Sequence, residues 1–313
     1  MPAPAAQLAW RGARAVASLA AVGLAVVVVA PVIPVWPLEL FEHFRVQCAA
    51  AGLVVVVACA ALRVRTYADA AAIAWLLNLT ILVTGLRPAR DLPTGTPVRV
   101  LLLNVLTSSS AHADVARLIA DTRPDIIGLV EVDQRWLDAL APALATYARL
   151  EHPRDDNFGL ALYARGTLTG NVEELGTPLP SLVARATVAD TTLHILLTHP
   201  LPPVSALAST NLTTQLVAVG ERSRTLPGAV VVLGDFNTTP WSRPFAALLS
   251  SSALCDTRDG FGIQATFPSS FALARIPIDH VLASCSVGVH DRRVEREVGS
   301  DHLPVVVDLV VPR

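Results

Sequence analysis

The sequence predicts an α/β domain built from two packed sheets with helices outside, preceded by three membrane-spanning helices. Three observations predict this organisation. Long apolar runs fill most of residues 1–86, and apolar runs of strand length alternate with helical stretches after residue 98. Several of those strand-like runs follow one another closely over residues 158–198, which favours antiparallel pairing over strict βαβ winding.

The apolar runs at the start of the chain are long enough to cross a membrane. The 313 residues are 52% apolar with a mean hydropathy of +0.51, which is more apolar than an ordinary soluble domain. The runs at about 15–33, 46–62 and 68–86 each approach the roughly 20 residues that cross about 30 Å of hydrocarbon. Three buried helices of a soluble protein are the alternative.

Arginine placement predicts the orientation of this anchor. Arg11 and Arg14 precede the first run. Arg63 and Arg65 separate the second run from the third. The positive-inside rule then places the N-terminus in the cytoplasm and everything after the third run outside the cell membrane.

Residues 87–97 contain three prolines and a glycine and are expected to link the anchor to the domain. Arg87 and Arg90 in this linker oppose the predicted orientation. The domain itself, residues 98–313, holds 17 arginines and 22 acidic residues, a balance of −5. An acidic domain is a poor partner for a nucleic-acid backbone, so nucleic acid is not expected to be the substrate.

The predicted strands and helices of the domain alternate without an internal repeat. The predicted helices cover residues 114–122, 134–144 and 205–223. The predicted strands cover residues 98–105, 125–132, 158–164, 181–188, 192–199, 229–236, 278–284 and 303–310.

Polar side chains stand where these apolar runs leave the core, which is where α/β proteins assemble sites from distant residues. They are Asn104, Glu131, His199, Asp235, Asn237, Asp301 and His302. Carboxylates, amides and imidazoles gathered in this way suit a hard divalent cation, Mg²⁺ or Mn²⁺, and an anionic phosphoryl group. The pattern therefore predicts a metal-dependent phosphoesterase.

The segment GDFN, residues 234–237, is the most specific of these signals. The pleat of a strand turns Asp235 and Asn237 to one face and sends Phe236 into the core. A carboxylate and an amide together can orient a water molecule and hold a phosphoryl oxygen. An Asx turn that closes the strand is the alternative interpretation.

Glu131 ends a buried strand and is the expected anchor for the metal ion, with Asn104 as a neutral oxygen ligand. A solvated glutamate is the alternative, but an unpaired carboxylate in so apolar a setting would be costly. In the segment SDHLP, Asp301 is expected to fix the imidazole of His302, which would face the phosphate.

Three further residues complete the set of candidates. Asp279 could orient His199 or a water molecule of the active site. Its neighbour His280 could equally face the opposite side of the same strand, and Asn157 is a candidate for the rim of the site. A serine hydrolase is disfavoured because no G-x-S-x-G elbow occurs.

The four cysteines divide evenly between the two parts. Cys48 and Cys59 lie in the second apolar run and are expected to pack as small apolar side chains. Cys255 and Cys285 lie in the outer domain, where a disulfide could persist, but sequence does not decide whether they meet.

The ordered set Asn, Glu, His, Asp-x-Asn, Asp, Asp-His resembles the endonuclease/exonuclease/phosphatase superfamily over about residues 98–311. The resemblance implies a four-layer α/β/β/α sandwich of the DNase I-like type. It implies that Glu131 and Asn104 bind metal and that Asp235 activates water. It also implies that Asn237, His199 and His302 contact the phosphate.

The three-span anchor further resembles actinobacterial membrane proteins of this superfamily that are associated with teicoplanin resistance, an antibiotic-resistance setting. The expected function is hydrolysis of a lipid phosphate or pyrophosphate of the cell envelope, with the membrane bilayer as partner and no protein partner implied. An extracytoplasmic nuclease or phosphodiesterase and a non-catalytic binding protein for an envelope ligand are the alternatives.

Overall fold

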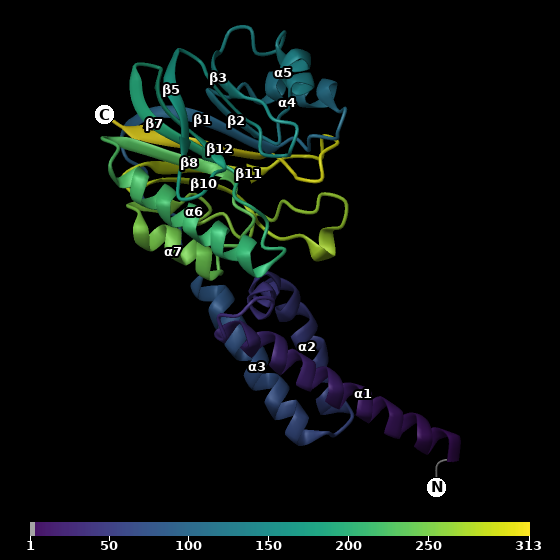
Figure 1. Cartoon of the computed structure of the whole chain (residues 1–313). Helices are drawn as coiled ribbons and strands as arrows, with labels where there is room; N and C mark the ends of the chain where they lie inside the picture. The colour runs from purple at the N-terminus through teal and green to yellow at the C-terminus, as the bar shows by residue number, and fades with distance from the viewer. Residues whose placement is uncertain (1–3) are drawn as a thin grey trace. The chain divides into compact units, whose positions relative to one another are not determined.

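The structure is a computed structural model that describes residues 4–313 (Figure 1). The chain divides into two compact units at the boundary between Leu86 and Arg87. Each unit is described by itself below.

The first unit consists of three helices that are long and apolar enough to cross a membrane. They are α1 (Pro4–Val29), α2 (Arg45–Ala61) and α3 (Arg65–Thr84), with short 3₁₀ segments at Ala30–Val32 and Leu38–Phe44. The helix α1 begins well before residue 15, where the sequence predicted the first span. The free cysteines Cys48 and Cys59 are buried among the helices, as expected of small apolar side chains.

A polar contact ties the three helices together inside this apolar unit. Arg45 Nη1 of α2 donates to the carbonyl of Val28 in α1, at 3.1 Å. Asn78 Nδ2 of α3 donates to the carbonyl of Arg45, at 2.8 Å. Hydrogen bonds between helices fix their register where lipid offers no competing partner.

The second unit contains two six-stranded mixed sheets that face each other. The first sheet has the order β11 (Gly288–Val294), β12 (Val305–Pro312), β1 (Gly95–Asn104), β2 (Ile126–Val130), β4 (Leu160–Ala164) and β3 (Ala148–His152). The second has the order β5 (Thr167–Glu174), β6 (Pro180–Val188), β7 (Thr191–Thr198), β8 (Ala229–Asp235), β10 (Asp279–Ser284) and β9 (Leu254–Asp256).

Strand pairing is parallel in one pair of each sheet, β1 with β2 and β7 with β8. Over residues 160–198, β4 pairs antiparallel with β2 and β3 in the first sheet, and β5, β6 and β7 pair antiparallel with one another in the second. This confirms the expectation of antiparallel strands in that stretch.

Alternation along each strand builds three apolar layers. In β1, Val100 and Leu102 face the core between the sheets, while Leu101 and Leu103 face the helices α4 (His112–Thr122) and α5 (Gln134–Leu140). The helices α6 (Ala206–Arg224) and α7 (Arg243–Ser251) cover the outer face of the second sheet. The result is the predicted four-layer α/β/β/α sandwich.

The chain leaves β8 through a position that only glycine can occupy. Gly234 has φ +153°, and a Cβ there would lie 1.8 Å from the carbonyl oxygen of Thr198. The absent side chain lets the end of β7 approach the end of β8 closely. Asp235 follows at the site, and Phe236 is fully buried in the helical layer, as the sequence predicted.

The segment expected to link the anchor to the domain packs on the second unit. The strand β1 begins at Gly95, and the carbonyl of Arg87 accepts a hydrogen bond from the Gly260 amide, at 2.8 Å. Arg87 and Arg90 both interact electrostatically with Asp259 of the same unit. Part of the positive charge of Arg87 and Arg90 is thus balanced by Asp259, so these two arginines oppose the predicted orientation less strongly.

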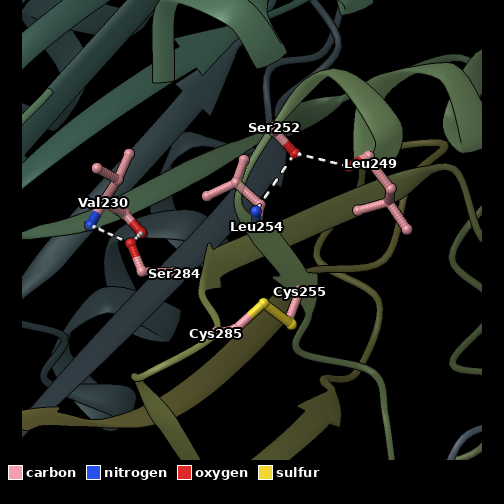
Figure 2. Close-up of a disulfide and its surroundings, with 7 residues drawn as sticks. All are labelled: Val230, Leu249, Ser252, Leu254, Cys255, Ser284 and Cys285. Carbon is pink, nitrogen blue, oxygen red and sulfur yellow. Dashed lines mark hydrogen bonds between the residues drawn. A yellow bond between two sulfur atoms is a disulfide. The ribbon is translucent and has the colours of Figure 1, made fainter. Parts of the chain in front are cut away.

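Cys255 and Cys285 form a disulfide, which answers the question that sequence left open (Figure 2). Cys255 lies in β9 and Cys285 directly follows β10, and the two Cα atoms are 5.0 Å apart. The bond therefore crosses two neighbouring strands at the edge of the second sheet. Beside it, the Ser284 hydroxyl accepts a hydrogen bond from the Val230 amide of β8, at 2.9 Å.

Candidate active site

The predicted polar residues converge where the two sheets meet. Asn104 at the end of β1 donates from Nδ2 to Glu131 Oε1 at 2.8 Å, just beyond β2 in the same sheet. The same amide group donates to Asp235 Oδ2 at 3.2 Å, at the end of β8 in the other sheet. Asn104 therefore bridges the sheets and holds two carboxylates close together.

Three candidate residues have left-handed backbone conformations. The φ values are +62° at Glu131, +66° at Asn157 and +49° at Asn237. Such conformations are uncommon for side chains other than asparagine, and they cluster at functional sites. The carbonyl of Glu131 is held by the hydroxyl of Thr107, at 2.9 Å.

Two interpretations of the GDFN segment, an Asx turn and part of an active site, were alternatives in the sequence. In the structure the segment forms the turn and also lies at the candidate site. Asp235 Oδ1 accepts from the Asn237 amide at 2.9 Å, which is an Asx turn. Its Oδ2 lies 3.6 Å from His199 Nε2 and 3.5 Å from His302 Nε2. One carboxylate oxygen thus closes the turn while the other faces the candidate site.

Asn237 connects this segment to His199. Its Nδ2 donates to the carbonyl of Pro200 at 3.0 Å and lies 3.2 Å from His199 Nε2. His199 is buried, its Nδ1 has no hydrogen-bond partner, and its ring lies 5.3 Å from that of Phe158. The histidine is therefore held from one side only.

The carboxylate that orients His302 is Asp279, so the expectation that Asp301 fixes the imidazole was wrong, while its charge does support the protonated form. Asp279 Oδ2 lies 2.8 Å from His302 Nδ1. Asp301 is the immediate neighbour of His302 in the chain, and its buried Oδ1 has no hydrogen-bond partner. The same pairing means that Asp279 orients His302 and not His199, as was also considered.

This pairing sets the protonation of His302. Burial by itself would lower the pKa of the imidazole, but the charges of Asp279 and Asp235, helped by Asp301, raise it to about 10. An imidazolium between two carboxylates is therefore the stable form at neutral pH. Such a cation can balance negative charge on a bound phosphoryl group.

His280 does not belong to the site. Its Nε2 is 2.8 Å from the carbonyl oxygen of Thr238, and its ring lies 5.1 Å from Phe236 and 4.6 Å from Phe245. Burial lowers its pKa to about 4, so it is neutral. The alternation along β10 turns Asp279 toward the site and His280 toward the helical layer. Asn157 is exposed on the loop beside Phe158, whose ring lies 5.3 Å from that of His199, and its place at the rim of the site stays a prediction.

Two residues of the site lacked a strong sequence signal. The Ser300 hydroxyl donates to the carbonyl of Asn104 at 2.6 Å and accepts from the His302 amide at 3.1 Å. In the sequence, Ser300 indicated only the cap of a turn. Phe267, whose ring lies 4.7 Å from that of His302, stands in a loop without any motif.

The residues present fit a hard divalent cation. Carboxylate oxygens of Asp235 and Asp279 lie within 4.8 Å of each other, beside the imidazolium of His302. Asp279 Oδ1 and Asp301 Oδ1 are buried without a hydrogen-bond donor. Together with Glu131 the site gathers three carboxylates against two imidazoles, and the charge of Asp301 adds to an excess of negative charge that a cation would offset.

The role expected of Asn104 differs from its geometry. Its Oδ1 accepts from the Leu106 amide at 3.0 Å, and its Nδ2 faces the carboxylates of Glu131 and Asp235. In this arrangement Asn104 positions the carboxylates, which are themselves the oxygen donors suited to a cation.

Solved structures share the fold of the second unit. TDP2 from D. rerio, solved as a complex with a single-strand DNA product, gives a TM-score of 0.58 at 18% identity, covering 68% of this chain and 99% of that one. A mannosyl-6-phosphatase from Bacteroides thetaiotaomicron gives a TM-score of 0.54 at 22% identity, covering 68% and 99%. A protein from Beutenbergia cavernae described as endonuclease/exonuclease/phosphatase gives 0.54 at 21% identity, covering 69% and 72%.

None of the curated proteins matches the sequence. A family model, by contrast, matches most of the domain. The matched segment begins at residue 101, inside β1, and ends at residue 302, the histidine that pairs with Asp279. The match thus spans both sheets and reaches every candidate side chain from Asn104 to His302, and the chain belongs to the Endonuclease/Exonuclease/phosphatase family.

Proposed function

We propose that this protein is a membrane-anchored phosphoester hydrolase that uses Mg²⁺ or Mn²⁺ and acts on a phosphate or pyrophosphate of a membrane lipid outside the cytoplasm. The observation that carries the proposal is the convergence of Glu131, Asp235 and Asp279 with two imidazoles, on a chain with three candidate membrane spans. The association with teicoplanin resistance stays an expectation from the sequence.

Asp235, Asp279 and Glu131 would hold a divalent cation, which would polarise the phosphoryl group. Asp235 would accept the proton of the attacking water at its Oδ2, the oxygen that is not used by the Asx turn. Asn237 Nδ2 would donate to a phosphoryl oxygen. The imidazolium of His302, held by Asp279, would balance the charge that develops as the new bond forms.

Two observations support an extracytoplasmic site. Arginines gather on the ends of the apolar runs that the positive-inside rule assigns to the cytoplasm. The disulfide Cys255–Cys285 is a bond that persists in oxidising compartments and is rare in the cytosol. Both favour a domain exposed outside the cell membrane.

The second candidate function is an extracytoplasmic nuclease or phosphodiesterase. The fold shared with TDP2, solved with a single-strand DNA product, favours it. The balance of −5 over residues 98–313 disfavours it, because a polyanion gains binding energy mainly from clustered cations.

The test uses the full-length protein in lipid nanodiscs. Release of inorganic phosphate from a polyprenyl pyrophosphate is measured with and without Mg²⁺ or Mn²⁺, and plasmid DNA is the parallel substrate. We expect metal-dependent release that Asp235→Ala and His302→Ala abolish while both variants still insert into membranes. Turnover retained in both variants would refute the assignment of the site, and cleavage of DNA alone would support the nuclease.

A further inference from the structure

Exposed apolar side chains of the second unit gather on two loops. Six large apolar side chains of this unit are exposed, and four of them lie in the segments 200–207 and 268–275, which we call the two apolar loops. Val204 and Leu207 are 73% and 71% exposed. Phe271 and Leu273 are 56% and 79% exposed. Exposed apolar groups gathered in this way indicate an interaction site.

The first apolar loop starts at the candidate site. It directly follows His199, and the carbonyl of Pro200 accepts the hydrogen bond from Asn237. The loop ends in the first turn of α6, where the hydroxyl of Ser205 caps the helix by accepting from the Ala208 amide at 3.1 Å. Leu207 is therefore held on a rigid helix end, a short distance along the chain from the site.

The second apolar loop is joined to the segment that carries His302. It belongs to the long excursion between β9 and β10 (Figure 1). The Ser269 amide donates to the carbonyl of Asp301 at 2.7 Å, and its hydroxyl donates to the carbonyl of Ser300 at 2.7 Å. Arg275 Nε closes the loop by donating to the carbonyl of Pro268, at 3.0 Å. Phe271 and Leu273 thus project from a loop that is anchored to the catalytic segment.

The charge of these segments is unlike that of the rest of the domain. About one residue in ten is acidic over residues 98–313, which hold 22 acidic residues. Residues 200–220 contain no acidic residue and no arginine, and residues 261–278 contain Arg275 and no acidic residue. Segments without acidic side chains are not repelled by an anionic lipid surface, which would repel the remainder of this acidic domain.

The chain itself keeps the domain near a bilayer. The third candidate span ends at Thr84 and β1 begins at Gly95. The ten residues between them reach at most about 35 Å when fully extended. A lipid surface is therefore always close to the domain that carries the two loops.

We infer that the two apolar loops insert into the interface of the bilayer on either side of the candidate site, so that the site opens at the depth of the lipid headgroups. The inference rests on the proposed function and narrows its substrate class. It favours a lipid whose phosphate or pyrophosphate stands at the headgroup level while its hydrocarbon chain stays in the membrane. Such a substrate does not have to be extracted before it is hydrolysed.

Insertion is tested by fluorescence quenching in the full-length protein. Cys48→Ala and Cys59→Ala remove the free thiols, and a fluorophore is attached at Leu207→Cys, at Leu273→Cys, or at Val172→Cys as control. Val172 is an exposed apolar side chain of the same domain, on β5. In vesicles of phosphatidylglycerol with brominated acyl chains, we expect at least twofold quenching at positions 207 and 273 and none at 172.

Equal quenching at positions 207, 273 and 172 would overturn the inference. Fluorescence at positions 207 and 273 that changes with protein density but not with bromination would assign the loops to a contact between two copies of the chain, which also overturns it.

A second measurement separates this inference from the proposed function. The variant Val204→Ser, Leu207→Ser, Phe271→Ser, Leu273→Ser is assayed on a long-chain lipid pyrophosphate in bilayers and on a water-soluble short-chain analogue. We expect the ratio of the two kcat/KM values to fall at least tenfold. Quenching without any lipid hydrolysis would refute the proposed function alone. Lipid hydrolysis with an unchanged ratio and no quenching would refute the insertion of the loops alone.

Discussion

The two ends of β1 both carry charged clusters, and the clusters are balanced in different ways. Near Gly95, the guanidinium of Arg99 pairs with Asp308 Oδ1 at 2.5 Å and donates to the carbonyl of Thr122 at 2.8 Å. Arg293 lies 3.4 Å from the other oxygen of Asp308. At the opposite end, Asn104 holds two carboxylates together with no cation of its own to offer.

The difference separates a structural cluster from a reactive one. Burial would raise the pKa of Asp308, but hydrogen bonds and charge from Arg99 and Arg293 lower it, so its negative charge is satisfied within the protein. At the Asn104 end, buried oxygens of Asp279 and Asp301 have no donor. A cavity of about 480 Å³ opens at the Arg99 end, lined in part by Arg123, Asp125 and His290. Concavity alone therefore does not mark the site.

The sharpest test of this comparison removes one carboxylate from each end. Asp235→Asn is expected to reduce kcat by about a thousandfold, because the variant loses the proton acceptor and a cation donor together. Asp308→Asn is the matched control and is expected to retain turnover within about twofold. Phosphate release by the two full-length variants measures both. Equal losses would mean that the two ends of β1 do not differ in function.

The second prediction concerns two histidines whose pKa values are shifted in opposite directions. His302 has a folded pKa of about 10, so the stability it contributes is present below its unfolded pKa near 6.5 and is lost as pH rises from 6.5 toward 10. His280 has a folded pKa of about 4, so its contribution is present above pH 6.5 and is lost as pH falls from 6.5 toward 4. The two shifts correspond to about 5 kcal/mol for His302 and about 3 kcal/mol for His280.

Melting temperature against pH, in detergent with a chelator present, checks these signs. His302→Gln should flatten the fall on the alkaline side. His280→Leu should flatten the acidic side only. A His302 variant that leaves the alkaline limb unchanged would contradict the assigned ion pair with Asp279.

Much of the fold was predictable because it depends on local patterns. Apolar runs such as 98–105 and 229–236 are buried strands in the structure, and the close spacing over 158–198 does produce antiparallel pairs. The linker was predicted less well. Its prolines and glycine signalled a break in secondary structure, but the hydrogen bond from Gly260 to Arg87 is a long-range contact that composition does not reveal.

In the candidate site, too, local patterns were predictable and long-range contacts were not. Strand ends were sufficient to select Asn104, Glu131 and Asp235. The parallel pairing of β1 with β2 brings the first two to one edge of their sheet, and Asp235 meets them from the end of β8 in the other sheet. Sequence proximity misassigned the partner of His302. Asp301 is the neighbour of His302 in the chain. Asp279 lies at the start of β10 and pairs with His302 because the two sheets meet there. The ligands of a side chain depend on tertiary packing, which residue order alone does not specify.

The third prediction concerns binding of the metal ion itself. If the Asn104 end binds Mg²⁺ or Mn²⁺, the metal at a hundred times its Kd stabilises the folded domain by about 2.7 kcal/mol. The melting temperature of the wild-type protein should therefore rise on addition of metal and fall on chelation. The rise should be reduced in Glu131→Gln and preserved in Asp308→Asn. A full rise in Glu131→Gln would exclude that carboxylate as a ligand.

The smallest expected effect is at the Arg99 end, where the ion pair with Asp308 is expected to contribute to stability and not to catalysis. The ion pair of Arg99 with Asp308 is partly exposed, with 36% and 19% of the two side chains accessible, so solvent screens much of its energy. A double-mutant cycle of Arg99→Met and Asp308→Asn, measured by denaturant unfolding in detergent, should give a coupling energy of about 1 kcal/mol. The coupling should decrease as salt is added, and added Mg²⁺ should leave it unchanged, because the cation belongs to the other end of the strand. A coupling that grows with Mg²⁺ would place a cation beside Asp308 and remove the distinction between the two ends.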